Sequence, residues 1–326
     1  MSFLKSEAPL LVYLAGGVQG GAVVQAALKR GLSVRALVRN PALTPGLSRP
    51  DVERVRADLS DPVSLLEASK GPRFAVIQIP TGPLDVMKAQ AANALNAARA
   101  CDIEGLILRL ASASRPAPCE EPSFVANRMI EDLASASGLP FAVVRPTLYL
   151  ENLLKPSALA DILDAGVFSP PIAATQAIAW TSVQDCANAA LTLLENGAFG
   201  GDHRIAGPES LAGPVFAARL SRAMGRSIRY QAQPIDSFER EIDDAMGPGA
   251  GRKISSKFRY FSAYPEEART ILADPYAPDP ALSGFEPMTI EDWANANRAA
   301  FSPAQNLPDA TAADDERGNK GDEPWG

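Results

Sequence analysis

The chain has few of the residues that build metal centres and disulfide frameworks. Among its 326 residues there are three cysteines, far apart in the sequence, and one histidine, His203. The cysteines have neither zinc-ligand spacing nor an even count, so we predict no metal site and reduced thiols in a reducing compartment. A lone histidine so far along the chain is not expected to be catalytic.

Long apolar runs and basic stripes are missing as well. No stretch of about 18 apolar residues occurs and the N-terminus lacks a signal-peptide pattern, so we expect a cytoplasmic protein without a membrane segment. The basic stripe that direct nucleic-acid binding would need is also missing. The net charge is −7, of which −4 lies in residues 303–326. This acidic segment is poor in apolar residues, and we predict that it is disordered.

What the sequence does contain is a glycine-rich turn within residues 9–40. Residues 10–14 form a short apolar run, typical of a strand covered on both faces in a parallel sheet. After the glycines, apolar residues recur at three- and four-residue spacing up to Gly31, which predicts a helix. Such a turn is either a simple strand-to-helix connection or a site where backbone N–H groups approach a pyrophosphate. The cofactor-binding residues predicted here are Gly16, Gly17, Gln19 and Gly20.

The next two predicted strands end in charged residues. Residues 33–38 lead to Arg39, where an acidic side chain would bind the ribose of NAD and an arginine fits the 2′-phosphate of NADP. We therefore predict NADP(H) as the cofactor, with a solvated strand end as the alternative for Arg39. Residues 52–57 lead to Asp58, which either accepts a hydrogen bond from adenine or caps a helix; the cap could instead belong to Asp61.

Strands and helices continue to alternate up to about residue 150. The predicted strands are 74–79, 104–110 and 140–144, and the predicted helices are 63–69, 84–100 and 121–137. This alternation predicts a doubly wound parallel α/β sheet of the Rossmann type with right-handed crossovers. Ligands of such sheets lie at the carboxyl ends of the strands. Residues directly after further strands are therefore site candidates, namely Pro80, Arg109 and Pro146.

Beyond Tyr149 the strict alternation fails. We predict helices at 151–165, 183–195, 215–224, 235–246 and 289–301, short strands at 177–180, 203–206 and 228–231, and a flexible break at 246–251. The predicted dinucleotide-binding domain is residues 1–150 plus about 177–206. Residues 151–176 and 207–302 then form a smaller mixed α/β lobe that covers the cofactor edge and holds the substrate.

Several sequence blocks together resemble the NmrA-like branch of the atypical short-chain dehydrogenase/reductases over residues 10–301. They are GGVQGGAVVQAALKRGLSVRALVRNP (16–41), ADLSDPVSL (57–65), SGLPFAVVRPTLYLENLL (137–154), AWTSVQDCANAA (179–190), AGPESL (206–211) and TIEDWANANRAAF (289–301). The resemblance implies NAD(P)H binding. The family includes quinone, phenylpropanoid-type and dye reductases, together with redox-sensing regulators that have no enzymatic turnover.

The chain departs from the pattern of this family at its expected site. The family turn resembles G-x-x-G-x-x-G, and Leu14 stands at the first glycine, where it would crowd the cofactor or shift the turn onto Gly16. Reductases of the superfamily pair a tyrosine with a lysine four positions later to donate a proton. No tyrosine here has such a lysine, and Asn127 stands at the lysine position. Arg109 replaces one of the serines that often end the preceding strand.

We name Arg109, Asn127 and Tyr149 as candidate catalytic residues. Arg109 could polarise a carbonyl or hold an anionic substrate, or else pair with a helix acid or a phosphate. Tyr149 corresponds to a family aromatic near the nicotinamide, and core packing is its alternative. Asn127 could hydrogen-bond the nicotinamide ribose or fill a helix surface.

Together these features predict an NADP(H)-dependent reductase of a small apolar or aromatic electrophile, such as a quinone or enone, that lacks the usual proton relay. Its partner would be this small-molecule substrate, and we leave a homodimer open. A non-enzymatic NADP(H) sensor remains an alternative. So does a repurposed isomerase, lyase or cyclase that uses the same cleft.

Overall fold

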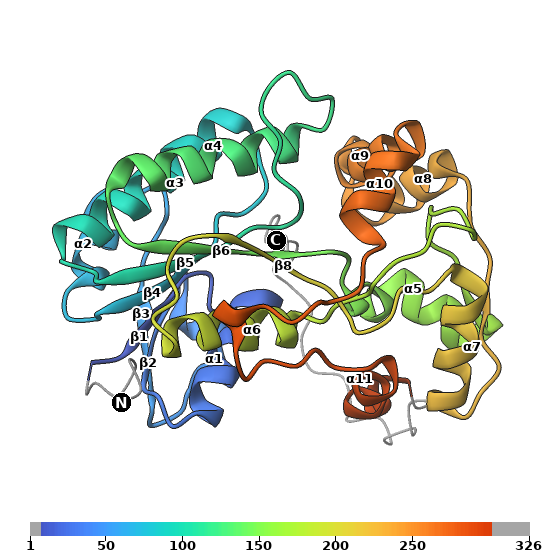
Figure 1. Ribbon diagram of the computed structural model, residues 1–326, viewed down its shortest axis with the longest axis horizontal. Helices are drawn as coiled ribbons and strands as arrows, with labels where there is room; N and C mark the ends of the chain where they lie inside the picture. Colours follow the sequence, from blue (N-terminus) through green and yellow to red (C-terminus); the bar gives the residue numbers. More distant parts are fainter. Residues whose placement is uncertain (1–7, 302–326) are drawn as a thin grey trace, which may run out of the picture.

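A seven-stranded parallel sheet forms the centre of the computed structural model, which describes residues 8–301 (Figure 1). The strands lie in the order β3-β2-β1-β4-β5-β6-β8, and every hydrogen-bonded pair is parallel. Their bounds are β1 (Leu10–Val12), β2 (Val34–Val38), β3 (Val52–Arg56), β4 (Phe74–Ile77), β5 (Gly105–Arg109), β6 (Phe141–Pro146) and β8 (Asp202–Ile205). The predicted doubly wound sheet is therefore confirmed.

Helices cover both faces of this sheet (Figure 1). One layer contains α1 (Val18–Lys29) and α6 (Val183–Glu195), and the other contains α2 (Pro62–Ser69), α3 (Leu84–Ala100) and α4 (Pro122–Ser137). Each layer encloses its own apolar core. Because strand side chains alternate, Ile107 of β5 belongs to the core under α1 and α6, while Leu106 and Leu108 belong to the core under α2, α3 and α4.

Side-chain caps fix where two of these helices begin. The carboxylate of Asp61 accepts from the backbone N–H groups of Val63 at 3.0 Å and Ser64 at 3.3 Å, so the cap of α2 belongs to Asp61. At the start of α6, Ser182 and Asp185 each accept from the other's backbone N–H in a capping box. Short 3-10 turns lie at η1 (Pro41–Leu43) and η2 (Pro45–Leu47).

After β6 the chain forms a mostly helical part beyond one end of the sheet (Figure 1). Its elements are η3 (Leu150–Leu154), α5 (Pro156–Ala160), η4 (Asp161–Ala165), β7 (Val167–Phe168), α7 (Gly213–Met224), β9 (Arg229–Tyr230), α8 (Ile235–Met246), α9 (Ala250–Ala263), α10 (Pro265–Leu272), α11 (Ile290–Ala296) and η6 (Arg298–Phe301). The turn η5 (Pro280–Leu282) instead packs on α6 and belongs to the core under α1 and α6. Strands β7 and β9 form a separate two-stranded parallel sheet.

Several predicted elements in this part are wrong. The predicted helix 151–165 is three short segments, because the proline at 156 has no N–H for the preceding turn and starts a new helix. The predicted strand 177–180 is a single bridge between Ile178 and Leu211. Helices α9 and α10 were not predicted. The predicted disordered segment 303–326 lies outside the described residues, and the division into two lobes stays a prediction.

A third apolar core joins most of the elements that follow β6 to the loop after β5 and to α4. Within it the rings of Trp180 and Phe216 stack with centres 4.9 Å apart. Glu151 ties three segments together at its edge, since its carboxylate accepts from the backbone N–H of Val183 and from the indole N–H of Trp293, each at 3.0 Å. No helix between residues 8 and 301 is long and apolar enough to cross a bilayer.

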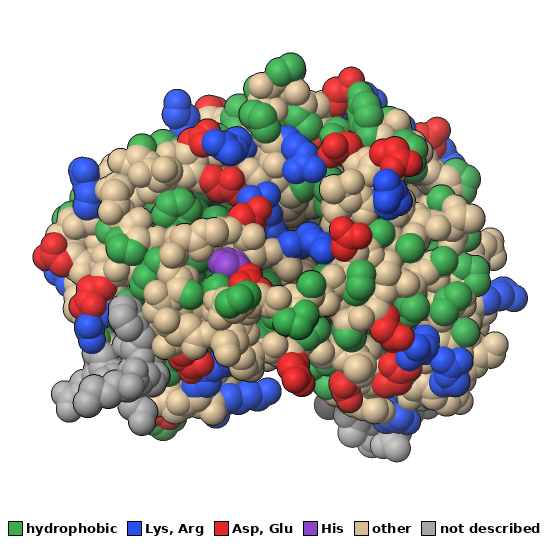
Figure 2. Space-filling model, in the orientation of Figure 1, with side chains coloured by type: hydrophobic (Ala, Val, Ile, Leu, Met, Phe, Trp, Pro, Cys, Tyr) green, Lys and Arg blue, Asp and Glu red, His purple; other side chains and the backbone are tan. Residues whose placement is uncertain are grey.

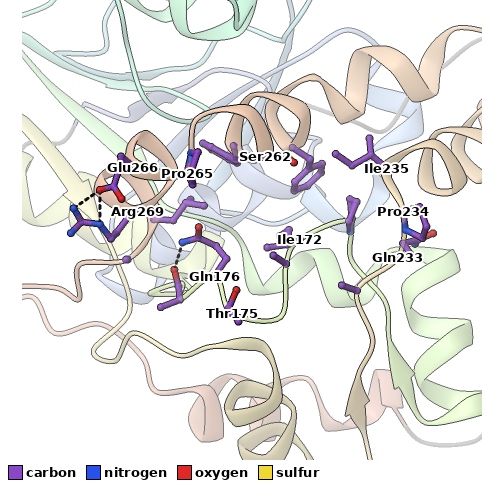
Figure 3. Close-up of a pocket in the computed structure, with 18 of the residues that line it drawn as sticks. Ile172, Thr175, Gln176, Gln233, Pro234, Ile235, Ser262, Pro265, Glu266 and Arg269 are labelled. Atoms are coloured by element: carbon purple, nitrogen blue, oxygen red, sulfur yellow. Dashed lines mark hydrogen bonds and ion pairs between the residues drawn. The ribbon is translucent and has the colours of Figure 1, made fainter.

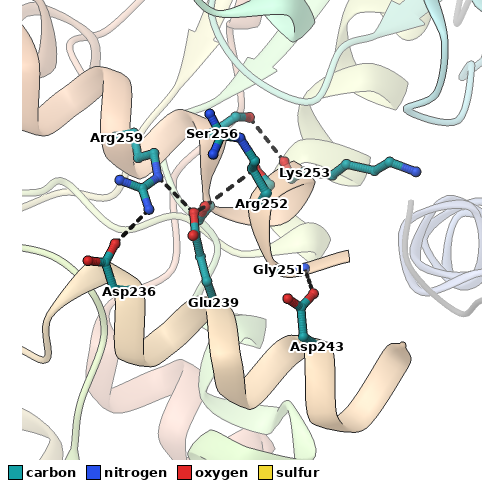
Figure 4. A network of polar contacts seen from close by, with 9 residues as sticks. Asp236, Glu239, Asp243, Gly251, Arg252, Lys253, Ser256 and Arg259 are labelled. Atoms are coloured by element: carbon teal, nitrogen blue, oxygen red, sulfur yellow. Dashed lines mark hydrogen bonds and ion pairs between the residues drawn. The ribbon is translucent and has the colours of Figure 1, made fainter. Parts of the chain in front are cut away.

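Helix α9 is held against α8 by a polar network (Figure 4). The guanidinium of Arg259 pairs with Glu239 and with Asp236, each at 2.7 Å, and this pairing lowers the pKa of Glu239 to about 2. The backbones of α8 and α9 also approach each other closely, because a Cβ at Gly251 would lie 2.1 Å from the carbonyl oxygen of Glu239. Glycine is therefore required at this crossing of the two helices.

Candidate functional site

The glycine turn after β1 is shaped for close backbone approach. Helix α1 begins after Gly17, which has no side chain to cap the first N–H groups of the helix. A Cβ at Gly20 would lie 2.2 Å from the carbonyl oxygen of Leu14, and one at Gly16 would lie 2.8 Å from Thr44 Cγ2. Glycine at position 20 is thus required by the fold, because its neighbours are backbone atoms, whereas the contact at Gly16 is with a side chain that can move.

Leu14 takes the backbone conformation that explains why a glycine is expected at this position. Its φ of 50° lies in the left-handed region, which is strained for leucine. The turn is closed by a hydrogen bond, since the N–H of Gly17 donates to the carbonyl of Leu14 at 3.0 Å, and the leucine side chain packs against the core under α2, α3 and α4.

The other predicted cofactor residues follow neighbouring strands at the same edge of the sheet, because all strands run parallel. Arg39 follows β2 and is exposed. Asp58 follows β3, where its carboxylate accepts from the N–H of Ser60 at 2.8 Å and stays exposed. Pro80 comes shortly after β4, and Pro146 is the last residue of β6.

Arg109 lies at the end of β5 and is only 2% exposed. Its Nη2 donates to the hydroxyl of Tyr149 at 3.0 Å, and its guanidinium carbon lies 5.8 Å from the centre of the Tyr149 ring. The same hydroxyl donates to Oε1 of Gln19, in the first turn of α1, at 3.3 Å. Nε and Nη1 of Arg109 have no hydrogen-bond partner within residues 8–301. We call Arg109, Tyr149 and Gln19 the arginine cluster.

The titratable groups next to this arginine are neutral. Burial raises the pKa of Tyr149 well above its ordinary value, and it raises the pKa of the Cys186 thiol to about 11. The charge of Arg109 works against both shifts without reversing either. The guanidinium is therefore a buried positive charge surrounded by a phenol, a thiol and an amide.

Asn127 does not belong to the arginine cluster. It lies on α4, is 3% exposed, and its Nδ2 donates to the backbone carbonyls of Ser112 at 3.2 Å and Ala113 at 2.8 Å. These bonds hold the loop that follows β5 against α4. At the position of the family lysine, the amide N–H groups are thus engaged with backbone.

A second group of buried charges was missed by sequence reasoning. Burial, with help from neighbouring Lys257, lowers the pKa of Lys155 to about 8, and burial also lowers the pKa of Lys257. Glu121 caps α4 by accepting from the N–H of Ser123 at 3.1 Å, and the hydroxyl of Ser256 on α9 donates to the same oxygen at 3.3 Å. No sequence motif marks these residues, because the contacts join segments more than 100 positions apart.

A cavity of about 790 Å³ lies between α9, α10, the first turn of α8 and the loops that follow β7 and β9 (Figure 3). Prolines and apolar side chains make up much of its wall, and none of the predicted site residues lines it. Representative lining residues are Ile172, Ile235, Phe258, Phe261, Gln176 and Ser262.

Charge on the outer surface is mixed. On the face drawn in Figure 2, acidic and basic side chains are interspersed and form no continuous basic stripe. In the part of the chain that the structure describes, no group of three or more His, Cys, Asp and Glu side chains could hold a metal ion.

Known proteins are similar to this chain along most of its length. The NAD(P)H azoreductase of Xenophilus azovorans is 26% identical over 302 residues, which cover 90% of this chain and all of the azoreductase. The NADPH-dependent quinone oxidoreductase of Escherichia coli, solved with NADPH, is 20% identical with a TM-score of 0.70, covering 88% of this chain and 99% of that one. The triphenylmethane reductase of Citrobacter sp., solved with NADP(H), is 18% identical with a TM-score of 0.71, covering 89% and 99%.

The two structural comparisons establish the fold, and the sequence comparison adds a relative that spans the same elements. The model of the NmrA-like family matches residues 7–294, which include the glycine turn, all seven strands of the main sheet and most of the part that follows β6. This protein therefore belongs to the NmrA-like family.

Proposed function

We propose that the protein is an NADPH-dependent reductase of a small apolar or aromatic electrophile such as a quinone or an enone. One observation carries the proposal: the N-terminus of α1, without a side-chain cap, and Arg39 follow adjacent parallel strands. An uncapped helix start binds a diphosphate, and an arginine after the second strand fits a 2′-phosphate. The similarity to an NAD(P)H azoreductase along its whole length supports the reductase class.

The residues at this edge have separate roles in the proposal. Gly16, Gly17, Gln19 and Gly20 form the turn for the diphosphate, and Arg39 and Asp58 hold the adenosine half. Pro80 and Pro146 close the edge further along the sheet. The bound cofactor would supply the hydride.

Tyr149 is the hydrogen-bond donor that we propose for the oxygen of the substrate, which would replace the Gln19 oxygen as the acceptor of its 3.3 Å hydrogen bond. Its raised pKa keeps the phenol protonated, and the guanidinium 3.0 Å from its oxygen eases partial negative charge on it. A phenol beside a cation resembles the pair that the family forms from tyrosine and lysine, although here the two groups come from separate strand ends. Arg109 is then a positioning residue for Tyr149, and Asn127 positions the loop after β5.

Titration of the purified protein with NADPH and NADH, by calorimetry or nicotinamide fluorescence, tests the cofactor. We expect NADPH to bind more tightly, and Arg39→Ala to remove most of the difference. Equal affinities for the two cofactors would overturn the NADP(H) assignment. Loss of nicotinamide absorbance with quinones, enones or dyes as acceptors then tests the reductase activity.

A sensor without turnover is the second candidate, and the engagement of Asn127 favours it. Its Nδ2 is bonded to two backbone carbonyls, so its N–H groups are not presented to a substrate. Tight NADPH binding without oxidation by any acceptor class, together with a cofactor-dependent change in protease sensitivity, would support the sensor over the reductase.

A further inference from the structure

The carboxyl edge of the main sheet collects cationic groups from several elements. Arg39 follows β2, and Arg56 ends β3 opposite Val38 in the strand register, and both arginine side chains are exposed. The start of α1 at the same edge has no side-chain cap and carries partial positive charge. The carboxylates of Asp58 and Asp61 lie there too, where each accepts a backbone N–H. The edge therefore offers an anion several donors, and two nearby carboxylates limit the attraction.

Arg109 is an independent sign of a ligand at this edge. Its side chain is 2% exposed, and Nε and Nη1 have no hydrogen-bond partner within residues 8–301. Nη2 donates to the hydroxyl of Tyr149, which in turn donates to Gln19 in the first turn of α1. Buried donors in folded proteins nearly always have an acceptor. Two open donors, linked in this way to the start of α1, indicate an acceptor that residues 8–301 do not supply.

The same chain contains such acceptors after its last described residue. Residues 309–316, which we call the acidic run, include four carboxylates and no basic side chain. The net charge of the whole chain is −7 and that of residues 303–326 is −4, which leaves −3 for the rest. Because the rest is not basic overall, an attraction for the acidic run must be local to a cationic edge.

Phe301 sets the point from which the acidic run extends. Its side chain is 5% exposed, and its ring centre lies 6.1 Å from that of Trp293. The indole of Trp293 donates to Glu151 at 3.0 Å, and Glu151 follows Tyr149 by two positions. The acidic run comes 8 to 15 positions after Phe301, and an extended chain of that length spans about 25 to 50 Å. The run can therefore reach the edge while Phe301 stays in its core.

We propose that the acidic run binds the carboxyl edge of its own chain and competes there with the dinucleotide. The inference rests on the proposed function for the identity of the competing ligand. Carboxylates and phosphates accept hydrogen bonds from the same guanidinium and helix-start donors, so one anion excludes the other. The match to the NmrA-like family ends at residue 294, so the acidic run lies outside it.

The connection through Phe301 makes a weak contact sufficient. A segment held this close to its site has an effective concentration in the millimolar range. With an effective concentration of about 5 mM and a local dissociation constant of about 1 mM, the apparent affinity for the dinucleotide falls about sixfold. Salt reduces this competition, because the screening length drops from about 10 Å at 0.1 M to about 3 Å at 1 M.

The experiment compares the wild-type full chain with two full-chain variants that each lose three negative charges. The run variant changes carboxylates of the acidic run, namely Asp314→Asn, Asp315→Asn and Glu316→Gln. The control variant changes exposed carboxylates on other elements, namely Asp51→Asn, Asp164→Asn and Asp244→Asn. Calorimetry measures the dissociation constant of NADPH at 0.05 M and 1 M salt, which are about the limits of weak and strong screening. We expect the run variant to bind NADPH severalfold more tightly at low salt, with the ratio close to one at high salt. The control variant should match the wild type.

Trypsin gives a second measurement that needs no reductase activity. Arg317 and Lys320 directly follow the acidic run, and trypsin cleaves after both types of residue. We expect NADPH, and separately inorganic pyrophosphate, to speed cleavage at these two sites in the wild type by displacing the acidic run. The same ligands should change the rate much less in the run variant. Mass spectrometry of the released fragments identifies the site of cleavage.

The outcomes separate this proposal from the proposed function. NADPH binding that is unchanged or weaker in the run variant at low salt overturns the competition and leaves the cofactor assignment intact. An equal gain in the control variant overturns it as well, because the effect is then one of total charge. If neither the wild type nor a variant binds NADPH, the proposed function fails and pyrophosphate decides: faster cleavage in the wild type supports the contact, and an unchanged rate overturns it.

Discussion

The two halves of the carboxyl edge of the sheet differ in how their charges are placed. Over β1, β2 and β3 the edge has an uncapped helix start and exposed charged side chains, Arg39 and Asp58. Beyond β5 and β6 it has a buried cation, Arg109, a half-buried cation, Lys155, and an asparagine bonded to backbone. The comparison indicates that, at the carboxyl edge of a Rossmann sheet, the residues after the first strands and the residues after the later strands can change independently.

The glycine turn is the rigid part of the first half, and Gly20→Ala breaks it. The new Cβ would meet the carbonyl of Leu14 at 2.2 Å and push α1 away from β1. We expect a loss of at least about 3 kcal/mol in the free energy of unfolding and loss of NADPH binding. Gly21→Ala is the matched control, because its nearest neighbour is 3.6 Å away. Urea unfolding of both variants measures the contrast, and equal stabilities would contradict it.

Asn127→Ala tests whether the polar residues beyond β5 and β6 stabilise the fold and do not act on a substrate. The change leaves two buried carbonyls without their donor, so we expect the free energy of unfolding to fall by about 2 kcal/mol. Arg128→Ala on the same helix removes a half-exposed ion pair and should cost less than about 1 kcal/mol. If Asn127→Ala leaves stability intact but abolishes NADPH oxidation, Asn127 is catalytic and the contrast between the halves weakens.

Lys155→Met tests the burial of charge beyond β6. Burial depresses the pKa of Lys155 to about 8 in the folded protein, against 10.5 in the unfolded chain. The protonated lysine therefore lowers the free energy of unfolding below pH 8, and this cost declines as the pH rises to 10.5. At pH 7 the variant should therefore be more stable than the wild type by about 1 to 2 kcal/mol. Thermal unfolding from pH 7 to 10.5 measures this, and the rise of stability with pH should be smaller in the variant. The exposed Lys253→Met on α9 is the control.

Leu14→Gly has the smallest expected effect. Glycine relieves a left-handed leucine, but it removes apolar packing and adds freedom to the unfolded chain. We expect stability to change by less than about 1 kcal/mol and NADPH affinity to stay within a few-fold. A large gain in affinity would show that Leu14 does crowd the cofactor, so the first half would also depart from the family.

The sequence predicted those parts of the fold that depend on local pattern. The apolar strands, the glycine turn and the Asp61 cap are local signals, and the structure contains each of them. Helices α9 and α10 were missed because the contacts that hold them, ion pairs between α9 and α8 and apolar side chains packed in the third core, join separate elements and leave no local pattern. The break at Pro156 was a local signal that we overlooked.

The site was less accessible to sequence reasoning for the same reason. Arg109 and Tyr149 were candidates by position after strands, but their hydrogen bond joins residues 40 positions apart and reaches Gln19 across another 130. The sequence marked Leu14 as a departure from the glycine pattern, and the structure shows its physical form, a leucine with positive φ in a turn closed by the N–H of Gly17. The roles assigned to the individual site residues stay predictions.

Glu151 has a consequence for the order in which the protein is made. Its carboxylate needs partners 32 and 142 positions later in the chain, Val183 and Trp293. Chains fold from the N-terminus as the ribosome extends them, so the sheet strands up to β6 can assemble while translation continues. The part after β6 lacks the indole of Trp293 until almost all described residues have emerged. The newborn chain therefore holds six of the seven strands of the main sheet well before the part that follows β6 is finished.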